Sequence, residues 1–87
     1  MPRTEFYSKS DAIRVIDHYK PLLIGKEIEE NSGAFITSFR IEDWGSEMYG
    51  VSVEAPLKDS ILRMSIGNIA YKFGLPSPST YLREQNG

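Results

Sequence analysis

The stretch that decides the fold is AFITSFRIEDWGSEMYGVSVEA, residues 34–55. Apolar and polar residues alternate on both sides of a central turn at Asp43–Ser46, and this period of two is typical of strands with one buried face. Pairing Phe39 with Val51 brings the two apolar sets onto the same face, as an antiparallel hairpin requires. The residues predicted to face the core are Phe35, Thr37, Phe39 and Ile41 in the first strand, and Tyr49, Val51, Val53 and Ala55 in the second.

A shorter strand is predicted just before this hairpin, at Lys26–Glu30. It is charged, and Ile28 is its only strong apolar anchor. Such a composition is typical of an edge strand that resists aggregation. Asn31–Gly33 would turn the chain into the hairpin, because Asn and Gly tolerate positive φ.

A helix is predicted from about Ser8 to Tyr19 or Lys20. Ser8 and Asp11 match a capping box, with Ser10 as a competing cap. Pro21 lacks an N–H donor and crowds the preceding turn, so we expect it to end the helix. The residues that would face the core are Ala12, Ile13, Val15, Ile16 and Tyr19.

Two interpretations remain open for residues 56–74. A helix would begin near Pro56 and end at Gly74–Pro76, a Gly-then-Pro stop signal. A hairpin would turn instead at Gly67–Asn68, a pair that suits a two-residue turn. We favour the helix because both of its ends are marked.

These elements predict a single α+β domain over residues 1–76, in the order α-β-β-β-α. Both helices would cover one face of a three-stranded antiparallel meander. The hairpin alternative would give one helix on a five-stranded sheet. Residues 77–87 would form a polar tail, docked by Tyr81 and Leu82 as a short helical turn.

The composition argues against an enzyme. A chain of 87 residues with no Cys and one His lacks the thiolate and the His cluster that catalytic and zinc sites use. A chain this small also has little volume for a deep cleft. His18 adjoins Asp17, but neighbouring helical residues point about 100° apart and make a poor catalytic pair. We expect no cofactor and no metal site.

No apolar run reaches the length of about 20 residues that a membrane span needs, and the first residues do not resemble a signal peptide. Small domains without disulfides are ordinary in the cytosol. We therefore expect a cytoplasmic protein.

The charge of the chain is unevenly distributed. The formal net charge of −2 combines an acidic middle, residues 27–54, with two flanks that carry a net +2 each. An acidic surface repels phosphate backbones, which makes nucleic acid an unfavourable partner. The turn of the hairpin gathers three of these acids around the single tryptophan. This predicts a partner-binding site at Glu42, Asp43, Trp44 and Glu47, unless Trp44 folds back over the sheet.

A second surface is predicted on the helical interpretation of residues 56–74. One face of that helix would carry a row of alternating small and large residues, and the small ones would allow another helix to approach closely. We expect either a homodimer contact there or burial within one subunit. The residues of the row are Ser60, Met64, Gly67 and Tyr71.

Residues 69–83, IAYKFGLPSPSTYLR, pair an apolar residue with Ala70, turn at Phe73–Leu75 and reach Ser79-Thr80. This segment resembles the helix-turn-helix of bacterial DNA-binding proteins. The resemblance implies DNA binding by a second helix. It departs from that pattern because Pro78 intrudes, and Arg83 is the only cation after Lys72.

The sequence thus predicts a non-enzymatic interaction protein, such as a small acidic adaptor, inhibitor or regulatory subunit that covers a basic surface of a protein partner. The alternative is an accessory DNA-binding protein.

Overall fold

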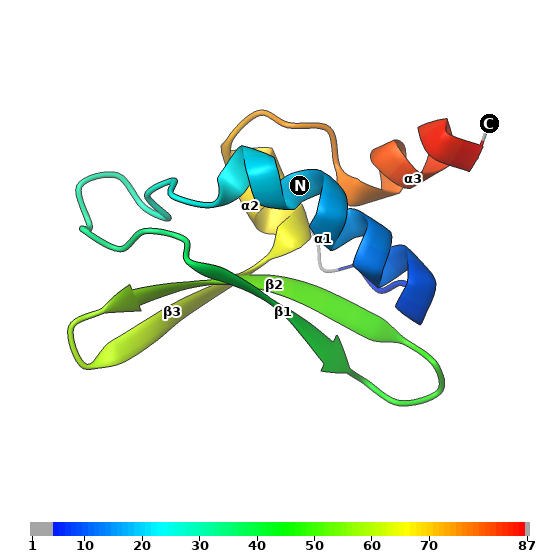
Figure 1. Cartoon of the computed structure of the whole chain (residues 1–87), viewed down its shortest axis with the longest axis horizontal. Coiled ribbons are helices and arrows are strands. Elements are labelled where there is room, and N and C mark those ends of the chain that lie inside the picture. Colours follow the sequence, from blue (N-terminus) through cyan, green and yellow to red (C-terminus); the bar gives the residue numbers. More distant parts are fainter. Residues whose placement is uncertain (1–4, 87) are drawn as a thin grey trace.

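The alternating stretch forms two neighbouring strands of a three-stranded antiparallel sheet, ordered β1-β2-β3. The computed structural model describes residues 5–86. Its elements are α1 (Lys9–Leu23), β1 (Ser38–Asp43), β2 (Tyr49–Leu57), β3 (Ser60–Ser65), α2 (Ile66–Lys72) and α3 (Pro78–Asn86). Figure 1 shows the helices gathered on one side of the sheet, with no described element over the other side. The predicted α+β class and α-β-β-β-α order are confirmed, and a further helix follows.

Helix α1 begins where the capping box predicts. The Ser8 hydroxyl accepts the Asp11 N–H at 3.2 Å. The prediction that Pro21 ends the helix is wrong, because α1 continues to Leu23. Tyr19 and Leu23 on either side of the proline are fully buried, and this packing outweighs the loss of one helical donor.

The segment between α1 and β1 is folded but is not a strand. The predicted edge strand Lys26–Glu30 is reduced to one bridge, between Glu27 and Phe35. The Glu27 carboxylate accepts the N–H groups of Asn31 at 3.2 Å and Gly33 at 2.8 Å. These bonds close the chain into a loop, while Ile28 remains buried in the core.

A β-bulge at the start of β1 changes which side chains face inward. Thr37 N–H donates to the Glu54 carbonyl at 3.0 Å, although Ser38 is the residue paired with Glu54. Thr37 and Ser38 thus both lie opposite Glu54. This extra residue shifts the alternation of inward and outward side chains by one position. Ile36 is buried and Phe35 is half-exposed, the reverse of the prediction.

The hairpin between β1 and β2 has the predicted faces in a different register. Phe39 pairs with Val53, and Ile41 pairs with Val51. The predicted pairing of Phe39 with Val51 is therefore wrong by two residues. A shift of two preserves the inward faces, since side chains repeat every second residue.

Residues 56–74 combine a strand and a helix, so neither interpretation holds in full. Pro56 belongs to β2, beyond Glu54, the last residue that pairs with β1. A proline there interrupts no ladder bond to β1. The chain turns back at Lys58 and Asp59 into β3, and no turn occurs at Gly67.

Helix α2 begins at Ile66, directly after its N-cap Ser65, whose side chain accepts the Asn68 N–H. Its last residue is Lys72, and the predicted stop signal at Gly74 follows directly after the C-cap Phe73. The N–H groups of Gly74 and Leu75 bond to the carbonyls of Tyr71 and Ala70, which is the Schellman pattern. Gly74 has φ 69°, which a residue without Cβ adopts at low cost.

Residues 78–86 form helix α3, which packs against α1. Ser77 caps it by accepting the Thr80 N–H at 3.2 Å. Tyr81 stacks on His18 of α1 with ring centroids 3.9 Å apart. The Tyr19 hydroxyl donates to the Pro76 carbonyl, and burial raises the pKa of Tyr19 to about 12.

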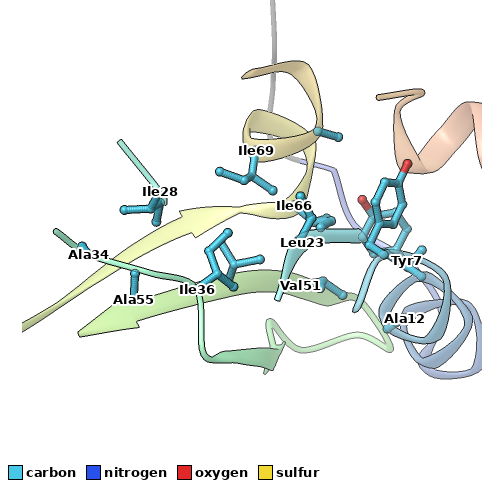
Figure 2. Packing of buried hydrophobic residues seen from close by; sticks show 14 residues of the cluster. Tyr7, Ala12, Leu23, Ile28, Ala34, Ile36, Val51, Ala55, Ile66 and Ile69 are labelled. Atoms are coloured by element: carbon cyan, nitrogen blue, oxygen red, sulfur yellow. The ribbon is translucent and has the colours of Figure 1, made fainter. Parts of the chain in front are cut away.

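The core lies between the helices and the inner face of the sheet. Figure 2 shows Leu23, Ile36, Ile66 and Ile69 converging above Val51. Tyr7 also belongs to this core, with 6% of its surface exposed. Its backbone exchanges two hydrogen bonds with Tyr49, at 2.8 and 2.9 Å. The segment before α1 is therefore part of the fold.

Candidate functional site

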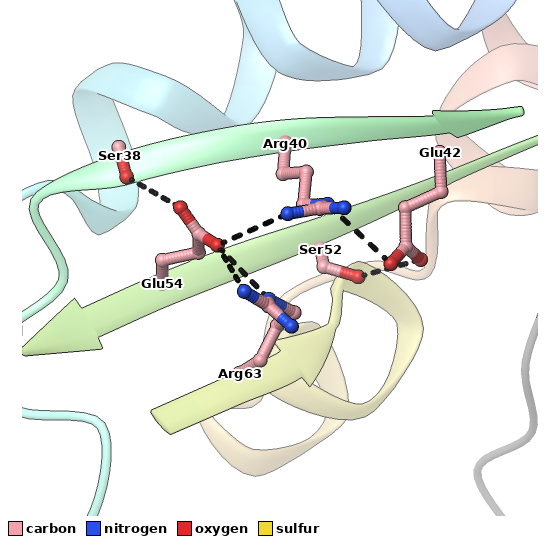
Figure 3. A network of polar contacts seen from close by, with 6 residues as sticks. All are labelled: Ser38, Arg40, Glu42, Ser52, Glu54 and Arg63. Atoms are coloured by element: carbon pink, nitrogen blue, oxygen red, sulfur yellow. Dashed lines mark hydrogen bonds and ion pairs between the residues drawn. The ribbon is translucent and has the colours of Figure 1, made fainter. Parts of the chain in front are cut away.

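The outer face of the sheet carries a network of charged side chains that no described element covers. Alternation along the strands points these side chains away from the helices. Figure 3 shows the network, which we call the charged sheet face. It consists of Ser38, Arg40, Glu42, Ser52, Glu54 and Arg63.

Glu54 is the centre of this network. Its carboxylate accepts from Arg63 at 2.9 Å and from Ser38 at 3.2 Å. Arg40 lies 3.8 Å from the same carboxylate and 3.6 Å from that of Glu42. Glu42 also accepts from the buried Ser52 at 3.3 Å. Two arginines therefore balance the two glutamates on this face.

Hydrogen bonds to the carboxylate, first from Arg63 and then from Ser38, hold the pKa of Glu54 below its ordinary value of 4.5. A carboxyl group whose pKa is lower in the folded than in the unfolded protein contributes its full stabilisation at pH values above its unfolded pKa. That stabilisation is lost as the pH falls from 4.5 through the lowered value.

We expect Glu54→Gln to be less stable than the wild type at neutral pH, with a difference that narrows as the pH falls through this acid range. Urea unfolding of both proteins at several pH values measures this difference in the free energy of unfolding. Arg63→Met removes the main donor, so it should weaken the pH dependence. A difference between Glu54→Gln and the wild type that does not change with pH would contradict the assignment.

Trp44 lies at one end of the outer face and packs directly on Gly50. A Cβ added to Gly50 would lie 2.2 Å from Cζ2 of Trp44, so only glycine permits this contact. The indole is held in place, yet 41% of its surface is exposed. It presents a fixed aromatic surface at the end of the β1–β2 hairpin.

The structure places the four residues of the predicted acidic site in different roles. Glu42 points along the sheet toward Arg40 and Ser52. Asp43 shapes the turn, since its Oδ1 accepts the Gly45 N–H at 2.9 Å. Glu47 is exposed on the other side of the turn, at φ 60°. We call Asp43, Trp44 and Glu47 the hairpin end.

A shallow groove adjoins the hairpin end on its Glu47 side, with a volume of about 510 Å³. It lies where the N-terminal segment and the start of α1 meet the β1–β2 hairpin and α3, which are distant from them in sequence. Asp11 in the groove pairs with Arg14 at 3.3 Å. The groove is lined by Phe6, Tyr7, Ser8, Asp11, Ser46, Glu47, Met48, Ser79 and Leu82.

The second predicted surface does not exist as a helix face. Ser60 and Met64 belong to β3, while Gly67 and Tyr71 belong to α2. Met64 packs against the core and Tyr71 is exposed. The prediction failed because the helix begins at the Ser65 cap and not near Pro56.

The segment that resembles a helix-turn-helix does contain two helices, α2 and α3, joined by residues 73–77. Lys72 and Arg83 are exposed on them. Tyr81 of α3 is held against α1, so this side of α3 is not available to a partner.

Sequence reasoning missed Gly50, Arg40 and Arg63 as site residues. A glycine within an alternating strand signals close approach of another group, and this signal was present at Gly50. The two arginines had no such signal, because Arg40 reaches Glu54 through the register of β1 and β2, and Arg63 reaches it through the position of β3.

Comparison with protein-family models, curated proteins and solved structures finds no match for this chain. Within residues 5–86, no helix is both long and apolar enough to cross a membrane. The same residues contain no group of three or more His, Asp or Glu side chains placed to hold a metal ion.

Proposed function

We propose that this protein is a non-enzymatic adaptor, inhibitor or regulatory subunit that binds a basic surface of a protein partner through the hairpin end. The observation that carries the proposal is Trp44, half-exposed and fixed on Gly50. Tryptophan is enriched at binding hot spots. An indole that is already ordered loses little freedom on binding.

The charges around Trp44 favour a cationic partner. Asp43 and Glu47 flank the indole in sequence and are exposed, and among residues 5–86 neither takes part in an ion pair. Exposed carboxylates steer a basic surface toward the site and disfavour acidic competitors. The charge-balanced sheet face beside them would extend the contact.

We expect Trp44→Ala to weaken partner binding by about 30-fold or more, the loss typical of a hot-spot residue. Affinity purification from the native cell with the wild type and the variant identifies the partner, and titration calorimetry with the purified partner gives both affinities. Tyr71→Ala is the matched control, because Tyr71 is a 68% exposed aromatic residue on α2.

Two further variants sharpen this experiment. Gly50→Ala should displace the indole and weaken binding while keeping Trp44 in the chain. Asp43→Lys with Glu47→Lys should reduce the association rate and its salt dependence. Binding equal to that of the wild type in folded Trp44→Ala and in the double lysine variant would overturn the proposal.

DNA binding is the second candidate function, and the observation in its favour is the pair of helices α2 and α3. Lys72 and Arg83 supply two cations on this pair. A mobility shift with duplex DNA that weakens with salt and with Arg83→Ala would support it. Absence of a shift at low salt would exclude it.

A further inference from the structure

Strand β1 has a free edge. It pairs with β2 alone, and within residues 5–86 its backbone makes no hydrogen bond to another segment on the opposite side. Trp44 N–H donates to the Met48 carbonyl across the hairpin at 2.9 Å. Since donors alternate in direction along a strand, the N–H groups of Phe39, Ile41 and Asp43 point outward from this edge.

A free edge accepts another strand, and natural proteins usually guard it with charges. On the outer face of β1 the charges have opposite signs two positions apart, at Arg40 and Glu42. An antiparallel copy of β1 related by a twofold axis through Ile41 would place Arg40 opposite Glu42 of the second copy, and the reverse. Both charged pairs would then be complementary.

The other twofold registers that use the outward N–H groups lack this property. Centring the axis on Phe39 would set Arg40 opposite Ser38 and shorten the overlap. Centring it on Asp43 would set Glu42 opposite Trp44. Centring it on Arg40 or on Glu42 would set that residue opposite its own copy, which places like charges opposite one another. Like charges directly opposite one another destabilise a pair of strands and opposite charges stabilise it. The charge pattern therefore selects one register.

The same register aligns exposed apolar surface on the helix-covered face. Ile41 is 37% exposed and would meet Ile41 of the second copy at the axis. Ile13 of α1 is 46% exposed. It lies about 140° around the helix from His18, which contacts α3, so it faces away from α3.

We propose that two copies of this chain associate through β1, in the antiparallel register centred on Ile41, to form a continuous six-stranded sheet. The partner at this edge is a second copy, because Arg40 and Glu42 of one β1 complement Glu42 and Arg40 of the other. The helices of both copies would cover the same face. The charged sheet face and Trp44 of each copy would remain on the uncovered side.

Light scattering coupled to size exclusion should show a dimer of the wild type at high concentration. Arg40→Glu places two carboxylates opposite each other, so we expect its dissociation constant to rise about tenfold or more. Glu42→Arg should act similarly. The double variant Arg40→Glu with Glu42→Arg restores opposite charges across the axis and should restore the dimer.

Circular dichroism establishes that each variant is folded, so that loss of the dimer is not loss of the fold. A wild type that stays monomeric at high concentration would overturn the proposal. It would also be overturned if the folded single variants dimerise as the wild type does, or if the folded double variant fails to regain the dimer.

A cross-linking experiment tests the register independently, because the chain contains no cysteine. Ile41→Cys would bring two thiols opposite each other at the axis, within the Cα separation that a disulfide spans. We expect rapid oxidation to a covalent dimer. Ile61→Cys, 55% exposed on β3, is the matched control. Faster cross-linking at position 61 would show that a different edge associates.

Discussion

Replacing Tyr7 with alanine is expected to lower the free energy of unfolding by about 3–5 kcal/mol, the range for removing a buried aromatic ring. Tyr7 is 6% exposed and packs in the core beside α1 and β2. Its hydroxyl donates to Glu5 at 3.1 Å. Burial is the main cause that raises the pKa of Tyr7, and the nearby charge of Glu5 raises it further.

Phe6→Ala is the matched control, since Phe6 is the preceding residue and is 61% exposed. We expect its free energy of unfolding to stay within about 0.5 kcal/mol of the wild type. Urea unfolding of the three proteins measures both effects. Equal stability of the two variants would mean that the N-terminal segment is not docked on the sheet.

The parts of the fold that were predicted correctly depend on local patterns. Ser8 and Asp11 define the start of α1 within a few residues of sequence. The alternation from Tyr49 to Ala55 fixes the buried face of β2, because one side of that strand meets the helices. Gly74 stops α2 by a local motif, in which the N–H groups of Gly74 and Leu75 bond to carbonyls of the last helical turn. Each of these signals is complete within one short segment.

The errors arise where the structure depends on a side-chain hydrogen bond or on a backbone group of another segment. Residues 26–36 read as a strand and a turn, but the Glu27 carboxylate binds backbone donors four and six residues on. The bulge at Thr37 depends on Glu54. Tyr7 is buried only because β2 offers the backbone of Tyr49 as a partner. Glu54 and Tyr49 belong to β2, outside the segments that they hold, and the hydrogen bonds of the Glu27 carboxylate leave no hydrophobic period in the sequence.

The candidate site was also predicted only where a local pattern was enough. The position of Trp44 and its neighbouring acids in a hairpin turn followed from the alternation on both sides of it. The indole's packing on Gly50 required the actual register of β1 and β2. The predicted row from Ser60 to Tyr71 assumed one continuous helix, and a change from strand to helix at Ser65 separated its members.

Ile69→Ala and Tyr71→Ala distinguish the observed helix from the hairpin interpretation of residues 62–73. In that hairpin the two residues would lie on the same face of one strand, and both changes would have similar effects. In α2 they lie about 200° apart around the helix axis. Ile69 is fully buried and Tyr71 is 68% exposed.

We therefore expect Ile69→Ala to lower the free energy of unfolding by about 2–5 kcal/mol, because it leaves a cavity between α2 and the sheet. Tyr71→Ala should change it by less than about 0.5 kcal/mol. Urea unfolding gives both values, and amide exchange of residues 69–72 reports whether the helical hydrogen bonds persist. Comparable losses from the two changes would contradict the helix, since only a strand buries both side chains together.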